Sequence, residues 1–174
     1  ATFDIYAVSH MKHHVSALLE CDVTESRKML RQVKSSGEKV SFNAWLIKVI
    51  GKTLNDHPEA AAYRSGKRKL IVFQNVNIST VVEKKIDGQR VPIPLVINKV
   101  NNKTVAEVTQ EMELAKKHIL TKKDIVLNER SNIMERLYDR DPAFRSRALW
   151  KFMLHNPKIA YKKMGNAIVT SVGM

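Results

Sequence analysis

A tight turn between two segments with strand character restricts the fold of this chain more than any other feature. Asp87-Gly88 is a dipeptide that favours the two-residue turn of a β-hairpin. Before it, every second residue is apolar or a threonine: Val76, Ile78, Thr80 and Val82. After it, Pro92 and Pro94 remove two backbone donors from the segment 91–97. We therefore predict an antiparallel strand pair whose second strand lies at the edge of a sheet.

The clearest helix is predicted upstream of this hairpin. It begins after Ser41, a favourable N-cap residue, and ends at Asp56-His57-Pro58. Its apolar stripe consists of residues at helical spacing: Phe42, Trp45, Leu46, Val49, Ile50, Thr53 and Leu54. Lys48 and Lys52 are expected on the opposite, solvated face.

Further helices are predicted on both sides of the hairpin. Thr104 and Glu107 form a capping box, and the stripe that follows consists of Val105, Val108, Met112, Ala115 and Ile119. Thr24 is the expected N-cap of an earlier helix, whose apolar face contains Met29, Leu30 and Val33. The segment 121–163 also has a helical pattern and is more basic than the rest.

Three more segments predict strands: Val15–Val23, Leu70–Phe73 and Asn166–Val172. Combined with the helices, they indicate an α/β chain, specifically an α+β two-layer sandwich with helices packed on a mixed sheet. The length of 174 residues fits a single domain covering 1–174. Cys21, within the first of these strands, is expected to be a small core residue.

The net charge of +13 points to a polyanionic partner, such as nucleic acid, an anionic membrane or a phosphorylated ligand. Residues 115–174 carry 13 basic and 5 acidic side chains, so most of the excess lies there. Trp150 and Phe152 stand among Arg145, Arg147 and Lys151, a pattern that would also suit a membrane surface or nucleic acid. A helix that faces the core explains the pattern better.

Several function classes are not expected for this sequence. A single cysteine cannot form an internal disulfide, which favours a reducing compartment and a cytoplasmic location. No run approaches the roughly 20 apolar residues that a membrane span requires. Six isolated glycines provide no phosphate-binding loop.

The histidines give no metal-site pattern of their own. His10, His13 and His14 form a cluster without a nearby acidic residue, and we interpret them as solvated or packed side chains. His57 lies in a helix-ending turn, and His118 and His155 stand among lysines on polar faces. No metal is expected.

Four segments occur together in the order and spacing of one known family. They are 40–48 followed by His57-Pro58-Glu59; 75–79 with Gly88 and 91–97; His14 with Asp22-Val23-Thr24; and 165–174 (GNAIVTSVGM). They resemble the catalytic domain of the dihydrolipoyl acyltransferases of 2-oxo acid dehydrogenase complexes, which has the chloramphenicol acetyltransferase-like fold. The resemblance covers residues 8–126 and 164–174. Residues 127–163 are therefore expected to be a basic helical insertion.

The resemblance implies transfer of an acyl group between a dihydrolipoyl thiol and coenzyme A. In the family, a histidine of an H-x-x-x-D-G motif takes the thiol proton, and a serine hydroxyl near the end of a strand stabilises the tetrahedral oxyanion. Register places Thr170 at that serine and Ser171 at the asparagine that follows it. Thr170 is the predicted catalytic residue, and Ser171 is the alternative if the register shifts by one. No coenzyme A-binding residues are assigned.

No histidine in these 174 residues is followed by an aspartate at the fourth position, so the catalytic histidine is absent from this chain. We expect the chain to be incomplete at its C-terminus. The alternative is a catalytically inactive trimeric scaffold or binding module, or a protein that binds an acidic partner through its basic helices.

By resemblance, the expected partners are coenzyme A or acyl-coenzyme A, a lipoyl-bearing protein, and further copies in a homotrimer or a multiple of trimers. No lipoyl attachment site is expected within the chain, and nucleic acid is not an expected partner.

Overall fold

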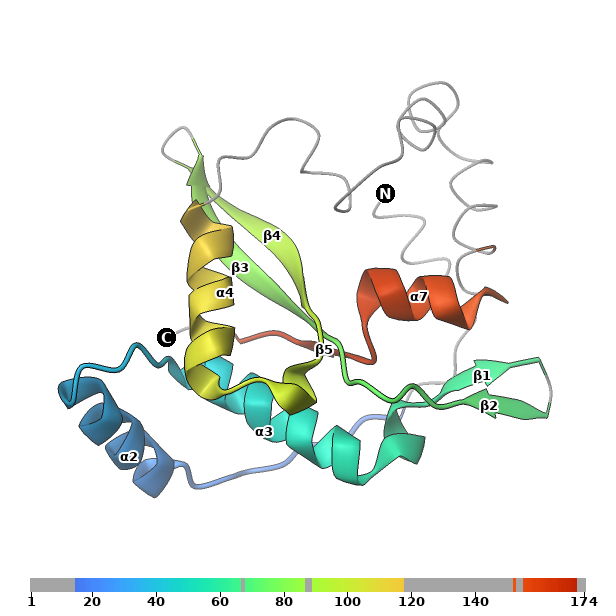
Figure 1. Cartoon of the computed structure of the whole chain (residues 1–174), viewed down its shortest axis with the longest axis horizontal. Coiled ribbons are helices and arrows are strands. Elements are labelled where there is room, and N and C mark those ends of the chain that lie inside the picture. Colours follow the sequence, from blue (N-terminus) through green and yellow to red (C-terminus); the bar gives the residue numbers. More distant parts are fainter. Residues whose placement is uncertain (1–14, 67, 87–88, 118–151, 153–154, 172–174) are drawn as a thin grey trace.

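The computed structural model describes residues 15–66, 68–86, 89–117, 152 and 155–171 of the chain (Figure 1). Its helices are α2 (Thr24–Ser35), α3 (Phe42–Asp56), α4 (Val105–Lys117) and α7 (Pro157–Met164), with short 3₁₀ turns η1 (Pro58–Ala61) and η2 (Val100–Asn102). Its strands are β1 (Tyr63–Ser65), β2 (Lys69–Ile71), β3 (Ile78–Ile86), β4 (Gln89–Ile97) and β5 (Ala167–Val169). The predicted α+β architecture with a mixed sheet is confirmed.

The predicted hairpin forms the larger part of the main sheet. β3 pairs antiparallel with β4 from Ile78–Ile97 to Ile86–Gln89, so two residues connect the strands. The strand order is β4-β3-β5, which confirms that β4 lies at an edge and leaves its two prolines exposed there. β5 joins the other side of β3 in parallel, and β1 and β2 form a separate two-stranded sheet.

The core lies between this sheet and the helices α3 and α4. The alternating residues of the β3 region are almost completely buried, at 3% exposure for Val76, 0% for Ile78, 5% for Thr80 and 2% for Val82. Val76, Ile78 and Val82 pack with Ile97 of β4, with Val100, and with Val108 and Met112 of α4. Burial of each large aliphatic side chain is worth about 1.5–3 kcal/mol relative to full exposure, so this cluster determines which face of the sheet is covered.

α3 occurs where it was predicted, but a different face of the helix is buried. The Ser41 side chain accepts a hydrogen bond from the Ala44 amide, as expected of an N-cap. The buried residues are Ala44, Ile47 and Gly51. A Cβ atom at Gly51 would lie 2.5 Å from a methyl carbon of Val100, so this face can approach η2 only because it carries small side chains. Much of the predicted stripe is half-buried, including Leu46, Ile50 and Leu54, and Val49 is 41% exposed.

Lys48 is not a solvated residue, contrary to expectation. Its ammonium donates to the carbonyl oxygens of Val100, at 3.1 Å, and Asn101, at 2.9 Å. These carbonyls belong to η2, and the Val100 carbonyl also accepts a hydrogen bond from the Lys103 amide at 3.2 Å. Lys52 is exposed, as predicted. Lys48 therefore connects α3 to the turn that joins β4 and α4.

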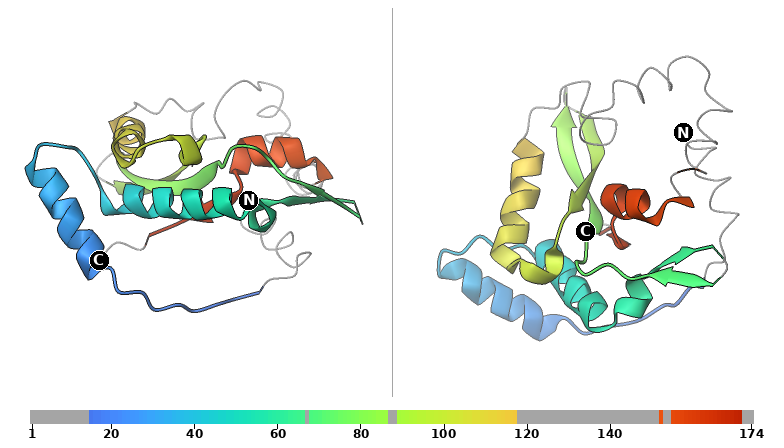
Figure 2. Two further views of the ribbon diagram at one scale, coloured as in Figure 1. Left: turned by 60° about the horizontal axis from the view of Figure 1, so that its bottom comes forward. Right: turned by 45° about the vertical axis from the view of Figure 1, so that its right-hand side comes forward.

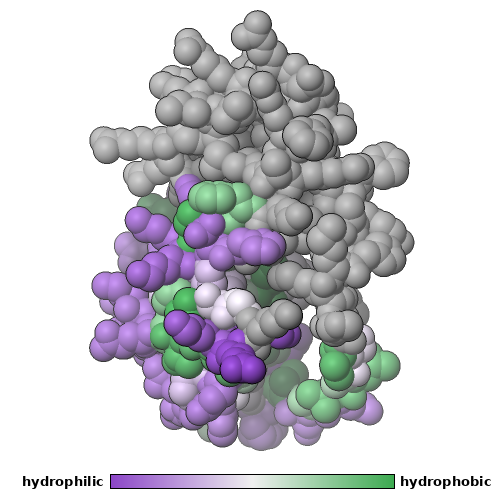
Figure 3. Space-filling model, turned by 90° about the vertical axis from the view of Figure 1, so that its right-hand side faces the viewer, coloured by the Kyte–Doolittle hydropathy of each residue, from purple (hydrophilic) through white to green (hydrophobic). Residues whose placement is uncertain are grey.

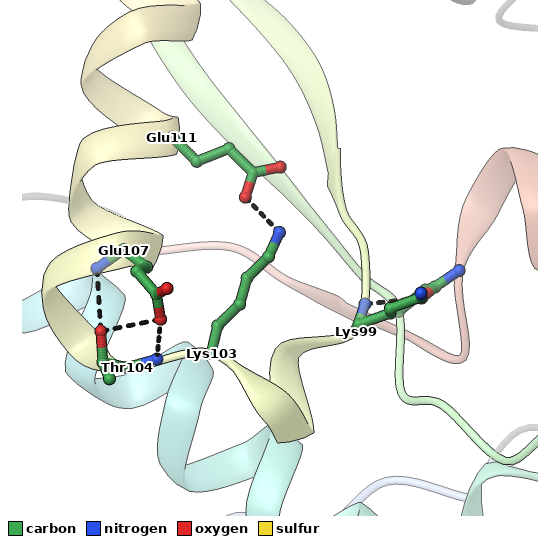
Figure 4. Close-up of polar contacts among 6 residues, drawn as sticks. Lys99, Lys103, Thr104, Glu107 and Glu111 are labelled. Atoms are coloured by element: carbon green, nitrogen blue, oxygen red, sulfur yellow. Dashed lines mark hydrogen bonds and ion pairs between the residues drawn. The ribbon is translucent and has the colours of Figure 1, made fainter.

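The capping box at the start of α4 is confirmed (Figure 4). The amide of Glu107 donates to the Thr104 hydroxyl oxygen at 3.2 Å, while the Glu107 carboxylate accepts from the Thr104 amide at 2.7 Å and from its hydroxyl at 2.9 Å. These hydrogen bonds, that of the amide first, lower the pKa of the Glu107 carboxyl, with smaller contributions from Lys103 and Lys48. The ionised carboxylate thus satisfies a donor that the helix itself cannot.

We expect Glu107→Gln to alter the acid dependence of stability. Because the pKa of Glu107 is lowered in the folded state, its contribution is present above the ordinary value of 4.5 and is lost as the pH falls through the lowered pKa. The native protein should therefore be more stable than the variant at neutral pH, and this difference should shrink below pH 4.5. Urea denaturation from pH 3 to 7 measures it. Glu113→Gln, on the exposed side of the same helix, is the control, and equal pH dependence in all three proteins would contradict the expectation.

Several predictions in the N-terminal part are wrong. Residues 15–23 form no strand; Val15, Leu18 and Leu19 are almost fully exposed, and Cys21, expected in the core, is exposed. Apolar content favours a strand only where a neighbouring strand supplies hydrogen bonds, and no strand among the described residues pairs with this segment. The helix α2 is confirmed, although its N-cap is Val23 instead of Thr24, and it contains no buried residue. Met29, expected inward, is 63% exposed.

The remaining predictions are met in part. β2 covers part of the predicted 70–73 strand, β1 was not predicted, and β5 is shorter than the predicted 166–172. Most of the predicted insertion at 127–163 lies outside the described residues, except for 152 and 155–163, which include most of α7. Among the described residues, no helix is long and apolar enough to cross a membrane.

Candidate functional site

The predicted site residues follow the last strand. β5 pairs with β3 through Ile78–Ala167, Ser79–Ile168 and Thr80–Val169, and Thr170 comes directly after the final pair. Val169 is 8% exposed and faces the core, whereas Ile168 is 63% exposed on the opposite face. Thr170 and Ser171 are both exposed, and neither hydroxyl forms a hydrogen bond within the described part of the chain. Alternation along the strand places Thr170 on the same face as Ile168.

The start of β5 is fixed by an unusual joint with β3. Gly165 is the C-cap of α7, and its φ of 71° and ψ of −176° are accessible almost only to glycine. The next residue, Asn166, donates its amide to the Asn77 carbonyl at 2.6 Å. Its side chain accepts from the Asn77 amide at 2.8 Å and donates to the Ala61 carbonyl at 3.1 Å. Asn166 therefore binds both backbone groups of Asn77 and also holds η1.

Asn77 continues this connection to the other edge of the sheet. Asn77 is only 5% exposed, and its Oδ1 accepts a hydrogen bond from the Lys99 amide at 2.9 Å. Figure 4 shows the Lys99 end of this bond. Lys99 has a left-handed φ of 54°, an uncommon conformation for a lysine, just after β4. Buried amides of this kind are costly unless they are paired, so the arrangement has little freedom to shift.

Three aromatic side chains hold α7 and the β1 strand beside this joint. The rings of Phe73 and Tyr161 stack at 3.8 Å with an interplanar angle of 5°, and Tyr63 meets Phe73 edge-on at 5.8 Å. The Tyr63 hydroxyl donates to the Gly165 carbonyl, and the Tyr161 hydroxyl donates to the Asn75 carbonyl at 3.0 Å. Burial raises the pKa of both hydroxyls, with a further contribution from Tyr161 at Tyr63, so both remain neutral donors at physiological pH.

Figures 1 and 2 show that α4 and α7 lie on opposite sides of the β3–β4 hairpin, with β5 leading away from α7. The side that carries α7 has hydrophobic residues exposed among hydrophilic ones (Figure 3). In the stretches 63–73, 152 and 155–164, the exposed large apolar side chains are Leu70, Val72, Phe152 and Ile159. Exposed basic residues also occur on β1, β2 and α7: Arg64, Lys69, Lys158 and Lys162.

The histidines are not gathered into a site by the described residues. His57 is the C-cap of α3 and His155 lies just before α7, and both are exposed. The cluster His10, His13 and His14, together with His118, lies outside the described residues. Within the described part of the chain, no group of three or more histidine, cysteine, aspartate or glutamate residues could hold a metal ion.

Sequence reasoning did not identify Asn77, Asn166, Tyr63 or Tyr161 as part of this region. A signal was nevertheless present, because asparagines stand at or near the ends of the predicted strands, at 75, 77, 98, 101 and 166. Asparagine is uncommon in strands and often binds neighbouring backbone through its side chain. Which backbone each one reaches depends on the three-dimensional arrangement.

A comparison with protein families shows to which family this chain belongs. The family described as 2-oxoacid dehydrogenases acyltransferase (catalytic domain) matches residues 7–126. The chain belongs to this acyltransferase family. The recognised resemblance is thereby confirmed, although the matched range ends before Thr170 and Ser171. A search among curated proteins gave no match.

Three solved structures have a fold similar to that of this chain. The truncated catalytic core of the 2-oxoacid dehydrogenase multienzyme complex from Thermoplasma acidophilum has a TM-score of 0.56 and 22% identity over 72% of this chain and 59% of its own. The cubic core of the pyruvate dehydrogenase multienzyme complex has a TM-score of 0.56 and 20% identity over 71% of this chain and 53% of its own. This chain thus spans little more than half the length of these structures.

A third similar structure is the dihydrolipoamide acetyltransferase of Azotobacter vinelandii, with a TM-score of 0.56 and 19% identity over 71% of this chain and 53% of its own. A serine, a histidine and an asparagine have been investigated for their role in the catalytic mechanism of that enzyme. At such identities, the three structures establish the fold that they share with this acyltransferase-family chain.

Proposed function

We propose that this chain is part of a coenzyme A-dependent acyltransferase that moves an acyl group between a dihydrolipoyl thiol and coenzyme A. Membership of the acyltransferase catalytic-domain family is the observation that carries the proposal. The exposed hydroxyl of Thr170, at the end of a strand held by the core, supports it. A hydroxyl donor at a rigid position is what stabilisation of a developing oxyanion requires.

In the proposed reaction, a thiolate attacks the carbonyl carbon of a thioester, and the carbonyl oxygen becomes an oxyanion. The Thr170 hydroxyl donates a hydrogen bond to that oxygen, and Ser171 takes this role if the register differs by one. The proton of the attacking thiol passes to the histidine of the family's H-x-x-x-D-G motif, which residues 1–174 do not include. Collapse of the oxyanion then expels the second thiolate.

The same proposal includes the assembly and the partners. The similar structures are cores of multienzyme complexes, which supports a homotrimer or a multiple of trimers and a lipoyl-bearing partner. The net charge of +13 suits the phosphates of coenzyme A. A cytoplasmic location is part of the proposal because the single cysteine fits a reducing compartment.

A catalytically inactive trimeric scaffold is the second candidate. It is favoured by one observation, the threonine at the position that register assigns to the family's serine. The two candidates differ in one measurable property, since only the enzyme releases free coenzyme A from a thioester in the presence of a dithiol.

The test uses the complete natural protein with acetyl-, propionyl- and branched acyl-coenzyme A as donors and dihydrolipoamide as acceptor. Formation of acyl-dihydrolipoamide is followed by its thioester absorbance, together with chromatographic detection of coenzyme A. We expect turnover with at least one donor, at about 1–1,000 s⁻¹ as is usual for enzymes. If none of these donors, nor the reverse reaction from acyl-dihydrolipoamide, gives product with a correctly folded trimer, the scaffold replaces the enzyme as the better proposal.

A further inference from the structure

β5 is too short to define its own position. It forms three residue pairs with β3, and it is an edge strand within the described sheet. A strand that slips by one residue moves by about 3.3 Å and turns every side chain to the other face. Such a slip would remove Thr170 from the face on which the proposed reaction requires it. Something beyond the three pairs must therefore set the register.

Asn166 has the geometry to do this. Its main-chain amide and its side-chain oxygen together satisfy the carbonyl and the amide of Asn77, at 2.6 and 2.8 Å. One residue thus replaces a further rung of the ladder immediately before the first regular pair, Ile78–Ala167. Its side-chain nitrogen donates to Ala61 in η1 at 3.1 Å, which fixes the amide against a second element.

The partner of Asn166 is buried and bonded on its other side as well. Asn77 is 5% exposed, and its side chain accepts the Lys99 amide at the end of β4. Each alternative position of Asn166 would leave the Asn77 amide and the Ala61 carbonyl without these bonds. Buried polar groups that lose their partners cost far more than the bond itself contributes, so only one register satisfies the joint.

We infer that Asn166 is a positioning residue of the acyl-transfer site: it sets the register of β5 and thereby places the Thr170 hydroxyl at the reacting carbonyl. The inference rests on the proposed function for its catalytic consequence and on the hydrogen bonds of Asn77 for its structural part. Asn166 acts through the strand and makes no contact with substrate. Its loss should lower the rate of the chemical step and leave substrate binding largely unchanged.

The test compares Asn166→Ala with Asn166→Asp in the complete natural protein. Alanine removes both side-chain bonds, whereas aspartate retains the acceptor for the Asn77 amide but replaces the donor to Ala61 with a carboxylate oxygen, which the Ala61 carbonyl oxygen repels. We expect kcat to fall by about 100-fold in the alanine variant, because an error of about 1 Å in placement has an effect of this size, with KM for acyl-coenzyme A within about twofold. The aspartate variant should lose less kcat than the alanine variant, because it keeps the bond to the Asn77 amide.

Asn102→Ala is the matched control, since Asn102 is an exposed asparagine bonded through its side chain to Asn75 and lies away from β5. It should retain kcat and KM. Unchanged kcat in Asn166→Ala would overturn the inference. If the alanine variant does not fold, the aspartate variant decides: kcat identical to that of the natural protein would then overturn the inference, because a side chain repelled by the Ala61 carbonyl should displace β5.

A second measurement keeps the inference separate from the proposed function. Amide hydrogen exchange of Asn77 and of residues 167–170 should be at least about tenfold faster in Asn166→Ala than in the natural protein, while α4 amides are unchanged. If the natural protein shows no acyl transfer but exchange at β5 responds in this way, the function fails and the positioning of β5 stands. Unaltered protection of β5 in Asn166→Ala overturns the positioning role itself.

Discussion

Replacing Gly165 with alanine should destabilise the fold more than any other single methyl group added to the described chain. A Cβ at this position would lie 2.4 Å from the Asn77 carbonyl oxygen and 2.8 Å from its carbon, and both atoms belong to the main chain. The backbone angles, φ 71° and ψ −176°, are in addition strained for any residue with a side chain. Since neither glycine nor Asn77 can move without breaking the joint, we expect a loss of about 4 kcal/mol from the free energy of unfolding.

Gly66→Ala is the control that isolates the close contact. Gly66 has a similar φ of 66°, but nothing lies within 4 Å of an added Cβ. Its substitution should therefore cost only the left-handed strain, about 1–2 kcal/mol. Denaturant titration of both variants gives the two free energies. A loss at Gly165 no larger than the loss at Gly66 would show that α7 and β5 do not approach β3 as described.

Replacing Thr170 with valine should have the largest effect on activity. Valine keeps the branched shape and removes only the hydroxyl, so the strand and its packing should be unaffected. Loss of one oxyanion donor typically lowers kcat by about 100- to 1,000-fold, and we expect this range with little change in KM. Thr170→Ser, which retains the hydroxyl, should keep most of the activity. Steady-state kinetics of acyl transfer with the complete natural protein measures all three quantities.

Ser171→Ala is the matched control for Thr170→Val, because its hydroxyl is one residue further along and equally exposed. If Ser171→Ala loses kcat and Thr170→Val does not, the register is shifted by one and Ser171 is the donor. If neither substitution changes kcat in an active enzyme, neither hydroxyl stabilises the oxyanion. Unfolding temperatures of both variants should stay within a few degrees of the natural protein.

Residue pattern was sufficient for those parts of the fold in which local chemistry and burial agree. The hairpin, the edge position of β4, the Ser41 cap and the Thr104–Glu107 box all follow from turn and cap preferences within a few residues. The buried face of β3 follows equally well, because alternation in a strand has only two possible faces. These are features that a short sequence window contains in full.

Predictions failed where a contact depends on distant backbone. On α3, hydrophobicity favoured the face with Phe42 and Trp45, whereas the closest approach is at Gly51, where a small residue admits η2. A hydropathy pattern identifies apolar side chains, and it gives no sign that a glycine such as Gly51 lets another element come close. Lys48 was placed in solvent because its charge is visible in the sequence and the carbonyls that bind it, 52 and 53 residues away, are not.

In the candidate site, too, features of a short sequence window could be predicted and contacts between distant residues could not. Thr170 and Ser171 could be proposed from a resemblance that depends on a short terminal motif, and the structure places them at the end of a strand with exposed hydroxyls. The residues that hold this strand could not be proposed, since Asn77 and Asn166 are 89 positions apart. No local rule links two such asparagines until the fold brings their backbones together.

The joint between Asn77 and Asn166 also has a kinetic consequence. The β3–β4 hairpin closes across two residues, while β5 must return across a separation of 89. Forming the second connection restricts a much longer loop, so β5 should be absent from the earliest structured species and join a hairpin already covered by α3 and α4. Substitutions at this joint would then act chiefly on the unfolding rate, and the lifetime of the native state would depend on a strand of only three residues.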